Sequence, residues 1–135
     1  MAVVSLQRYY ARLYSLLHTR RDCDVEALTL EEFERERFAV VEGRIQFWDG
    51  SRLVFTETLA MRGVSLVKTR YAYQYHDEQG RLRFRYDNAP HHPQIATHPH
   101  HKHVVDPRSG VERIEATTAP NLDDVLREIE GFVYL

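Results

Sequence analysis

The chain has 135 residues, which predicts a single domain over residues 1–135 with one core. Its 43% hydrophobic and 28% charged residues are typical of a soluble globular protein. The net charge of −2 excludes a global basic surface, so any contact with nucleic acid has to come from a local patch. The lone Cys23 excludes an internal disulfide and indicates a reducing compartment.

The N-terminal residues carry no sign of an export signal or a membrane anchor. Arg8 and Arg12 interrupt the first apolar stretch, which argues against a signal peptide. No apolar run approaches the roughly eighteen residues that span a bilayer. We therefore expect a cytoplasmic protein that has no membrane partner.

The first half of the chain predicts one helix followed by strands. Apolar residues recur at intervals of three and four from Ser5 to His18, which predicts an amphipathic helix. The segment from Asp24 to Arg37 favours a short strand, although a polar helical turn fits part of it. β-formers predict a strand over Phe38–Phe47, and Asp49-Gly50 is a pair typical of tight hairpins. Another strand is expected over Leu53–Leu59.

A second hairpin is expected from Leu66–His76 and Arg81–Asp87, joined by the four residues from Asp77 to Gly80. This loop length predicts three facing pairs: Tyr75 with Leu82, Tyr73 with Phe84, and Tyr71 with Tyr86. Because side chains alternate along a strand, one face is aromatic and is expected to pack under the helices. The opposite face is expected to carry Lys68, Arg70, Gln74, His76, Arg81, Arg83 and Arg85.

The C-terminal segment predicts a closing helix. Asn121 is a suitable N-cap, and apolar residues from Leu122 to Phe132 lie on one face of the helix that follows. The order helix, strands, helix predicts the α+β class. We expect a mainly antiparallel sheet of four or five strands with the N-terminal and C-terminal helices packed on one face.

Histidines are concentrated between the second hairpin and the closing helix. Six of the eight histidines lie between His91 and His103. Pro90, Pro93 and Pro99 cannot continue a helix or a central strand, so the segment is expected to be a constrained loop. Imidazole titrates near neutral pH and binds metals, so this loop is the candidate working part of the protein.

Several motifs of this region resemble one known family. They are Asp49-Gly50-Ser51, Tyr73-Gln74-Tyr75, Gly80-Arg81-Leu82, Asp87-Asn88-Ala89-Pro90-His91-His92-Pro93 and Pro99-His100-His101-Lys102-His103. Over roughly Val40 to Leu126 the chain is similar to the TumE family, in which relatives often have an apolar residue in place of His98. The resemblance implies a toxin of a two-gene toxin–antitoxin module, paired with a helix-turn-helix antitoxin. It implies no particular chemistry.

A metal-independent ribonuclease is the first chemical hypothesis. RNA cleavage next to a 2′-hydroxyl needs a base, an acid and cations that stabilise the phosphorane. The candidate catalytic residues are His91, His92, His100, His101, His103, Asp87 and Lys102. The candidate substrate-binding residues are Lys68, Arg70, Arg81, Arg83, Arg85, Tyr73, Tyr75 and Asn88. Tyr73 or Tyr75 could stack an unpaired base if its ring faced solvent.

Two alternatives remain open at this point. His101 and His103 have a spacing that suits one ion on an extended strand, and zinc and manganese are equally arguable. Against a metal, no thiol or carboxylate cluster lies nearby in the sequence, and Lys102 is expected to place a positive charge beside the ion. In the third reading the histidines are structural, and the protein acts by binding a partner. The first hypothesis needs no cofactor, and the sequence leaves a homo-oligomer open.

Overall fold

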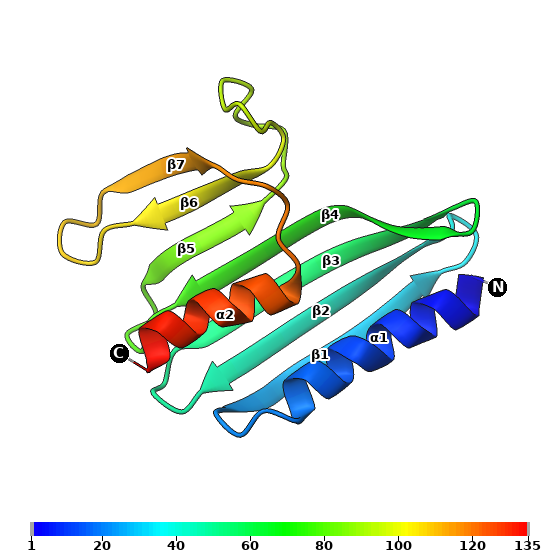
Figure 1. Ribbon diagram of the computed structural model, residues 1–135, viewed down its shortest axis with the longest axis horizontal. Helices are drawn as coiled ribbons and strands as arrows, with labels where there is room; N and C mark the ends of the chain where they lie inside the picture. The colour runs from blue at the N-terminus through cyan, green and yellow to red at the C-terminus, as the bar shows by residue number, and fades with distance from the viewer. Residues whose placement is uncertain (1, 135) are drawn as a thin grey trace.

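The computed structural model describes residues 2–134, with side chains from Ser5 onward. The described residues form two helices and one antiparallel sheet of seven strands, paired in chain order (Figure 1). Their bounds are α1 Ala2–His18, β1 Cys23–Phe33, β2 Phe38–Phe47, β3 Arg52–Arg62, β4 Ser65–His76, β5 Leu82–Asp87, β6 His101–Val105, β7 Glu112–Ala116 and α2 Leu122–Val133. The α+β class is confirmed, and the expected count of four or five strands is wrong.

The two additional strands, β6 and β7, follow the proline-rich segment. β6 begins inside the histidine motif, where the sequence predicts a loop that continues to His103. β7 has one large apolar side chain, Ile114, among charged neighbours. Neither strand shows the alternation of apolar and polar residues that marks a half-buried strand, because neither contributes a side chain to the apolar core; β7 is the edge strand and β6 is its neighbour.

Both helices lie on the same face of the sheet (Figure 1). Alternate side chains of β2, β3 and β4 point toward them and form the core, with Val41, Leu53 and Tyr73 fully buried. Leu17 of α1 and Ile129 of α2 complete this layer and are also fully buried. Neither described helix is long and apolar enough to span a membrane. Among the described residues, no helix covers the opposite face of the sheet, which we call the open face.

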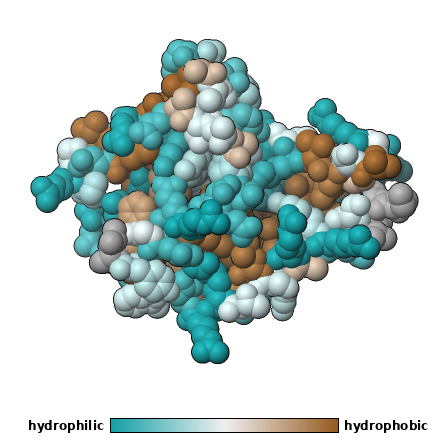
Figure 2. Space-filling view, in the orientation of Figure 1, coloured by the Kyte–Doolittle hydropathy of each residue, from teal (hydrophilic) through white to brown (hydrophobic). Residues whose placement is uncertain are grey.

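The surface that carries the helices has an apolar hollow, which lies at the ends of two long hairpins. Figure 2 shows apolar side chains between the two helices and toward the start of α1. The hollow has a volume of about 330 Å³, and Leu6, Phe33, Phe38 and Leu66 contribute to its lining. Nothing in this lining resembles the histidine motifs, so the candidate chemistry lies elsewhere.

In the hairpin of β4 and β5, Tyr73 and Tyr75 of β4 each pair with the residue of β5 two positions after the expected one. Tyr75 lies opposite Phe84, and His76 lies opposite Leu82, so Arg83 is an extra residue between the two pairs. Asp77 stabilises the longer turn by accepting hydrogen bonds from the backbone amides of Gln79 and Arg81. Tyr73, Tyr75 and Phe84 still share the core face, because a shift of two residues preserves the alternation.

Two β-bulges place Lys68 and Arg83 away from the open face, so their expected face is wrong. Thr69 is extra in the pairing of β3 with β4, and Lys68 consequently lies opposite the buried Leu59. The guanidinium of Arg83 lies 4.8 Å from the ring centre of Phe132 in α2. Each bulge is a single inserted residue, so the side chains beyond it point to the face opposite to the one that regular alternation predicts.

Lys68 belongs to a polar cluster within the core. Its Nζ donates to the hydroxyl of Tyr73 (2.6 Å) and to the carbonyl of Pro120 (2.9 Å). Glu57 is fully buried, lies 3.7 Å from Nζ, and accepts hydrogen bonds from the hydroxyls of Tyr9 and Tyr73. Burial and the Glu57 carboxylate raise the pKa of both tyrosines, and burial lowers the pKa of Lys68 despite that carboxylate. The cluster thus joins α1 to the centre of the sheet.

Replacing Gly43 with alanine is expected to destabilise the fold by roughly 1–3 kcal/mol, the usual cost of overpacking a core. A Cβ atom added at Gly43 would lie 2.2 Å from the ring of Phe55, which is itself buried and stacked on the ring of Tyr73. Chemical denaturation measures the loss. The double variant Gly43→Ala with Phe55→Leu is expected to recover part of it, and an unchanged midpoint in Gly43→Ala contradicts the packing described here.

Candidate functional site

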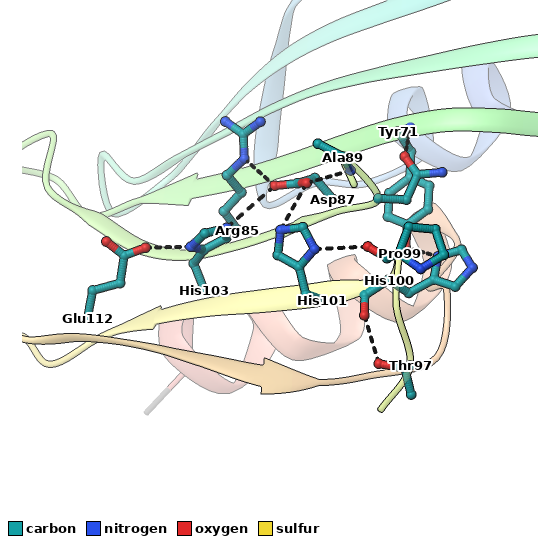
Figure 3. Close-up of polar contacts among 11 residues, drawn as sticks. Tyr71, Arg85, Asp87, Ala89, Thr97, Pro99, His100, His101, His103 and Glu112 are labelled. Atoms are coloured by element: carbon teal, nitrogen blue, oxygen red, sulfur yellow. Dashed lines mark hydrogen bonds and ion pairs between the residues drawn. The ribbon is translucent and has the colours of Figure 1, made fainter. Parts of the chain in front are cut away.

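Asp87 is the centre of the histidine region. It ends β5 on the open face, yet its side chain is buried. Its Oδ2 accepts from Nε of Arg85 (2.8 Å), and its Oδ1 accepts from the amide of Ala89 (2.9 Å; Figure 3). Burial raises the pKa of this carboxyl, but these two hydrogen bonds and the nearby His101 more than offset it, so the pKa lies below its usual range.

The pairing of β5 with β6 brings two histidines to Asp87. His101 lies opposite Asp87, and His103 lies opposite Arg85, so all four side chains share the open face. Nε2 of His101 lies 3.1 Å from Oδ1 of Asp87, and Nε2 of His103 lies 3.6 Å from Oδ2 (Figure 3). A carboxylate at the end of one strand is therefore shared by two imidazoles of the next.

His92 completes a group of three imidazoles, which we call the histidine cluster: His92, His101 and His103. It comes from the loop before β6, and its ring centre lies 4.8 Å from that of His101 and 5.6 Å from that of His103. One nitrogen of each of the three rings lies within 4.8 Å of the others. Burial and the two neighbouring imidazoles lower the pKa of His92, and Asp87 counteracts them.

The remaining nitrogens of His101 and His103 face hydrogen-bond acceptors. Nδ1 of His101 lies 2.9 Å from the carbonyl oxygen of Pro99, and Nδ1 of His103 contacts the carboxylate of Glu112 in β7. A carbonyl or ionised carboxylate oxygen only accepts hydrogen bonds, so the Nδ1 atom of each ring is the donor and carries the hydrogen. These contacts direct Nε2 of both rings toward Asp87 (Figure 3).

The structure separates the other motif histidines and Lys102 from the cluster. His100 is directed to Tyr71, with its Nδ1 2.8 Å from the tyrosine hydroxyl. Burial and the charge of Asp87 raise the pKa of Tyr71 to about 12, so this hydroxyl keeps its proton. His91 is exposed in the loop. Lys102 points to the helix side, where its Nζ lies 2.6 Å from Glu128 of α2.

The candidate substrate-binding residues do not form one surface. Tyr73 and Tyr75 are buried in the core, so the exposure needed for stacking on a base is not met. Arg81 forms an ion pair with Asp77 in the hairpin turn, whereas Arg85 pairs with Asp87 inside the site. Arg70 is exposed on β4.

Asn88, a candidate substrate-binding residue, has its side chain hydrogen-bonded to the backbone of β4. Its Oδ1 accepts from the amide of Tyr71, and its Nδ2 donates to the carbonyl of Thr69. It thereby satisfies backbone groups beside the bulge in β4. This arrangement fixes the start of the loop that carries His92.

A groove on the open face lies near the site. It has a volume of about 470 Å³, and Arg44, Thr56, Ala72 and Gln74 contribute to its lining. Ala72 pairs with Asp87, and Gln74 pairs with Arg85, so the groove adjoins the strand that ends at the site. The groove is not apparent from the sequence, because it depends on the curvature of several strands together.

Glu112 is a further site residue, and the sequence motifs do not include it. It lies in an exposed stretch with charged neighbours, and nothing in its local pattern distinguishes it from solvated surface. A prediction of β6 and β7 as a hairpin beginning at His101 could have found it.

The arrangement offers two kinds of chemistry. Imidazoles beside a carboxylate can hold and transfer protons, and the guanidinium of Arg85 can stabilise negative charge. The three converging nitrogens of the histidine cluster can also bind a metal ion. Asp87 and Glu112 supply the carboxylates for either chemistry, which the sequence motifs alone do not indicate.

Comparison with known proteins assigns the family. No curated protein and no solved structure matches the chain. A family model described as toxin TumE matches residues 13–133, which include every strand, α2 and the whole histidine region. The chain therefore belongs to the TumE family of toxins.

Proposed function

We propose that this toxin cleaves RNA and that the histidine cluster with Asp87 and Arg85 is its working centre. The convergence of three imidazoles on one buried carboxylate carries the proposal. Isolated surface histidines do not require such convergence. A groove of about 470 Å³ lies on the same face of the sheet, next to the strand that ends at Asp87. Membership in a toxin family gives such a centre a biological role.

RNA cleavage makes demands that these groups can meet. A base removes the proton of a 2′-hydroxyl, whose oxygen attacks the adjacent phosphorus. The bond from phosphorus to the 5′-oxygen breaks, and that oxygen takes up a proton from an acid. Arg85 is placed to stabilise the charge on the phosphorane.

The toxin family implies an antitoxin partner, and we propose a helix-turn-helix protein encoded by the adjacent gene. Expression of the chain alone is expected to arrest growth, and co-expression of the adjacent gene is expected to restore it. Growth curves at matched protein levels measure both effects. Unimpaired growth with verified folded protein counts against the toxic activity, and arrest without rescue counts against the proposed partner.

His92 and His91 form a matched pair for testing the cluster. They are neighbours in one loop, but His92 contacts His101 and His103 whereas His91 is exposed and belongs to no such contact among the described residues. His92→Ala is expected to reduce RNA cleavage in cells at least tenfold, because it removes one of the three imidazoles. His91→Ala is expected to retain cleavage. Mapping of new RNA 5′ ends after induction measures both variants, and equal effects refute a specific role of the cluster.

A further inference from the structure

We propose that His92, His101 and His103 bind one divalent transition-metal ion, for which zinc is the best match. The inference concerns the proposed ribonuclease centre, but ion binding can be measured without RNA. Failure of the metal proposal and failure of the ribonuclease proposal are therefore distinguishable.

The spacing of the three nitrogens suits a single ion. They lie within 4.8 Å of one another, whereas histidine nitrogens around tetrahedral zinc lie about 3.4 Å apart, given zinc–nitrogen distances of about 2.0–2.1 Å. Because His92 is partly exposed in its loop, a rotation of its ring can bring its nitrogen closer to the other two.

The hydrogen bonds of the outer nitrogens also match a metal site. Nδ1 of His101 donates to the carbonyl of Pro99, and Nδ1 of His103 donates to the carboxylate of Glu112. Metal-binding histidines usually donate their second N–H to such a group, which fixes the ring and leaves the other nitrogen as the ligand. When the ring of His101 or His103 is neutral, the lone pair of its Nε2 faces the Asp87 carboxylate, and these two electron-rich groups repel each other. A cation bound by both groups removes this repulsion.

The surrounding charges favour a dication. Asp87 and Glu112 place two carboxylates at the cluster, against one guanidinium from Arg85. Lys102, which the sequence places between two ligands, points to the helix side and pairs with Glu128. The sequence gives two arguments against a metal: the charge of Lys102 and the lack of a thiol or carboxylate cluster nearby in the chain. Strand alternation turns Lys102 away from the cluster, and Asp87 of β5 and Glu112 of β7 supply the carboxylates.

The ligand types select the kind of metal. Imidazole suits zinc, cobalt and nickel, whereas magnesium prefers oxygen ligands and keeps its water shell. With three protein nitrogens, a fourth position remains for an Asp87 oxygen or for solvent, as in catalytic zinc sites. Bound there, the ion would act as a Lewis acid toward a phosphoryl oxygen.

The test uses the full chain, purified without a histidine tag and stripped of metal with a chelator that is then removed. Titration calorimetry with Zn²⁺ is expected to show one site per chain, and Co²⁺ is expected to give the visible absorption of a tetrahedral complex. His92→Ala and His103→Ala are expected to weaken binding at least tenfold. Glu112→Gln is expected to weaken it by about tenfold, the usual effect of losing an outer partner. His91→Ala and His98→Ala are the matched controls and are expected to bind as the unchanged chain does.

Two results overturn the proposal. One is the absence of a stoichiometric Zn²⁺ site in protein whose circular dichroism and melting curve show that it is folded. The other is equal weakening in His91→Ala and His92→Ala, which indicates adventitious binding to exposed imidazoles. Mg²⁺ is expected to give no specific heat, and tight 1:1 Mg²⁺ binding at these residues also contradicts the ligand argument.

Discussion

Replacing Asp87 with asparagine is expected to lower RNA cleavage by up to about 10⁴-fold, the scale of effect seen when a carboxylate that orients a catalytic imidazole is neutralised. The carboxylate contacts His101 and His103 and pairs with Arg85, so its charge organises the whole centre. Asparagine keeps the shape but offers an amide in place of one carboxylate oxygen. Cleavage of a labelled RNA by purified variants measures the effect.

Asp77→Asn is the matched control for this prediction. Asp77 is also a buried aspartate that pairs with an arginine, Arg81, and accepts backbone hydrogen bonds, but it lies in the hairpin turn away from the cluster. Both variants are expected to lose roughly 1–3 kcal/mol of unfolding free energy, because each removes a charged acceptor. Cleavage is expected to fall in Asp87→Asn alone. An equal loss of cleavage in both variants means that stability and not chemistry explains the effect.

Replacing Glu57 with alanine is expected to destabilise the protein by about 3–5 kcal/mol, the usual cost of removing one partner of a buried ion pair. The change leaves Lys68 in the core without its counter-charge and removes the acceptor of two tyrosine hydroxyls. Denaturant unfolding monitored by circular dichroism measures the loss. Glu42→Ala, on an exposed position of β2, is expected to change stability by less than about 0.5 kcal/mol.

A double variant separates charge from packing at Glu57. Glu57→Leu together with Lys68→Met replaces the ion pair with apolar side chains of similar volume, and such replacements are often neutral or stabilising. The double variant is expected to be more stable than either single variant. If the loss of stability in the double variant equals the sum of the losses in Glu57→Leu and Lys68→Met, the two residues are not coupled.

The sequence predicted the parts of the fold that depend on local chemistry. The periodicity from Ser5 to His18 and the cap at Asn121 correspond to α1 and α2, and Gly50 has the positive φ expected at its hairpin turn. These features need no distant contact. The bulges at Thr69 and Arg83 were not predictable by a period of two, because one extra residue reverses the face of every side chain beyond it.

The candidate site was predicted in composition but not in arrangement. The motifs identified Asp87, His92, His101 and His103, yet they gave no reason to separate these residues from His91, His100 or Lys102. The separation follows from β6, which puts His101 and His103 on one face and Lys102 on the other. Glu112 enters from β7, a strand too polar to recognise from its own residues.

The most direct test of the proposed centre is cleavage of single-stranded RNA by purified protein that is free of antitoxin. A labelled RNA and a DNA of the same sequence are incubated with the unchanged chain, with Asp87→Asn and with His91→Ala. The unchanged chain and His91→Ala are predicted to cut the RNA and leave the DNA intact, and Asp87→Asn is predicted to leave both intact. Intact RNA with the folded unchanged chain, or equal cutting by Asp87→Asn, contradicts the assignment of this centre.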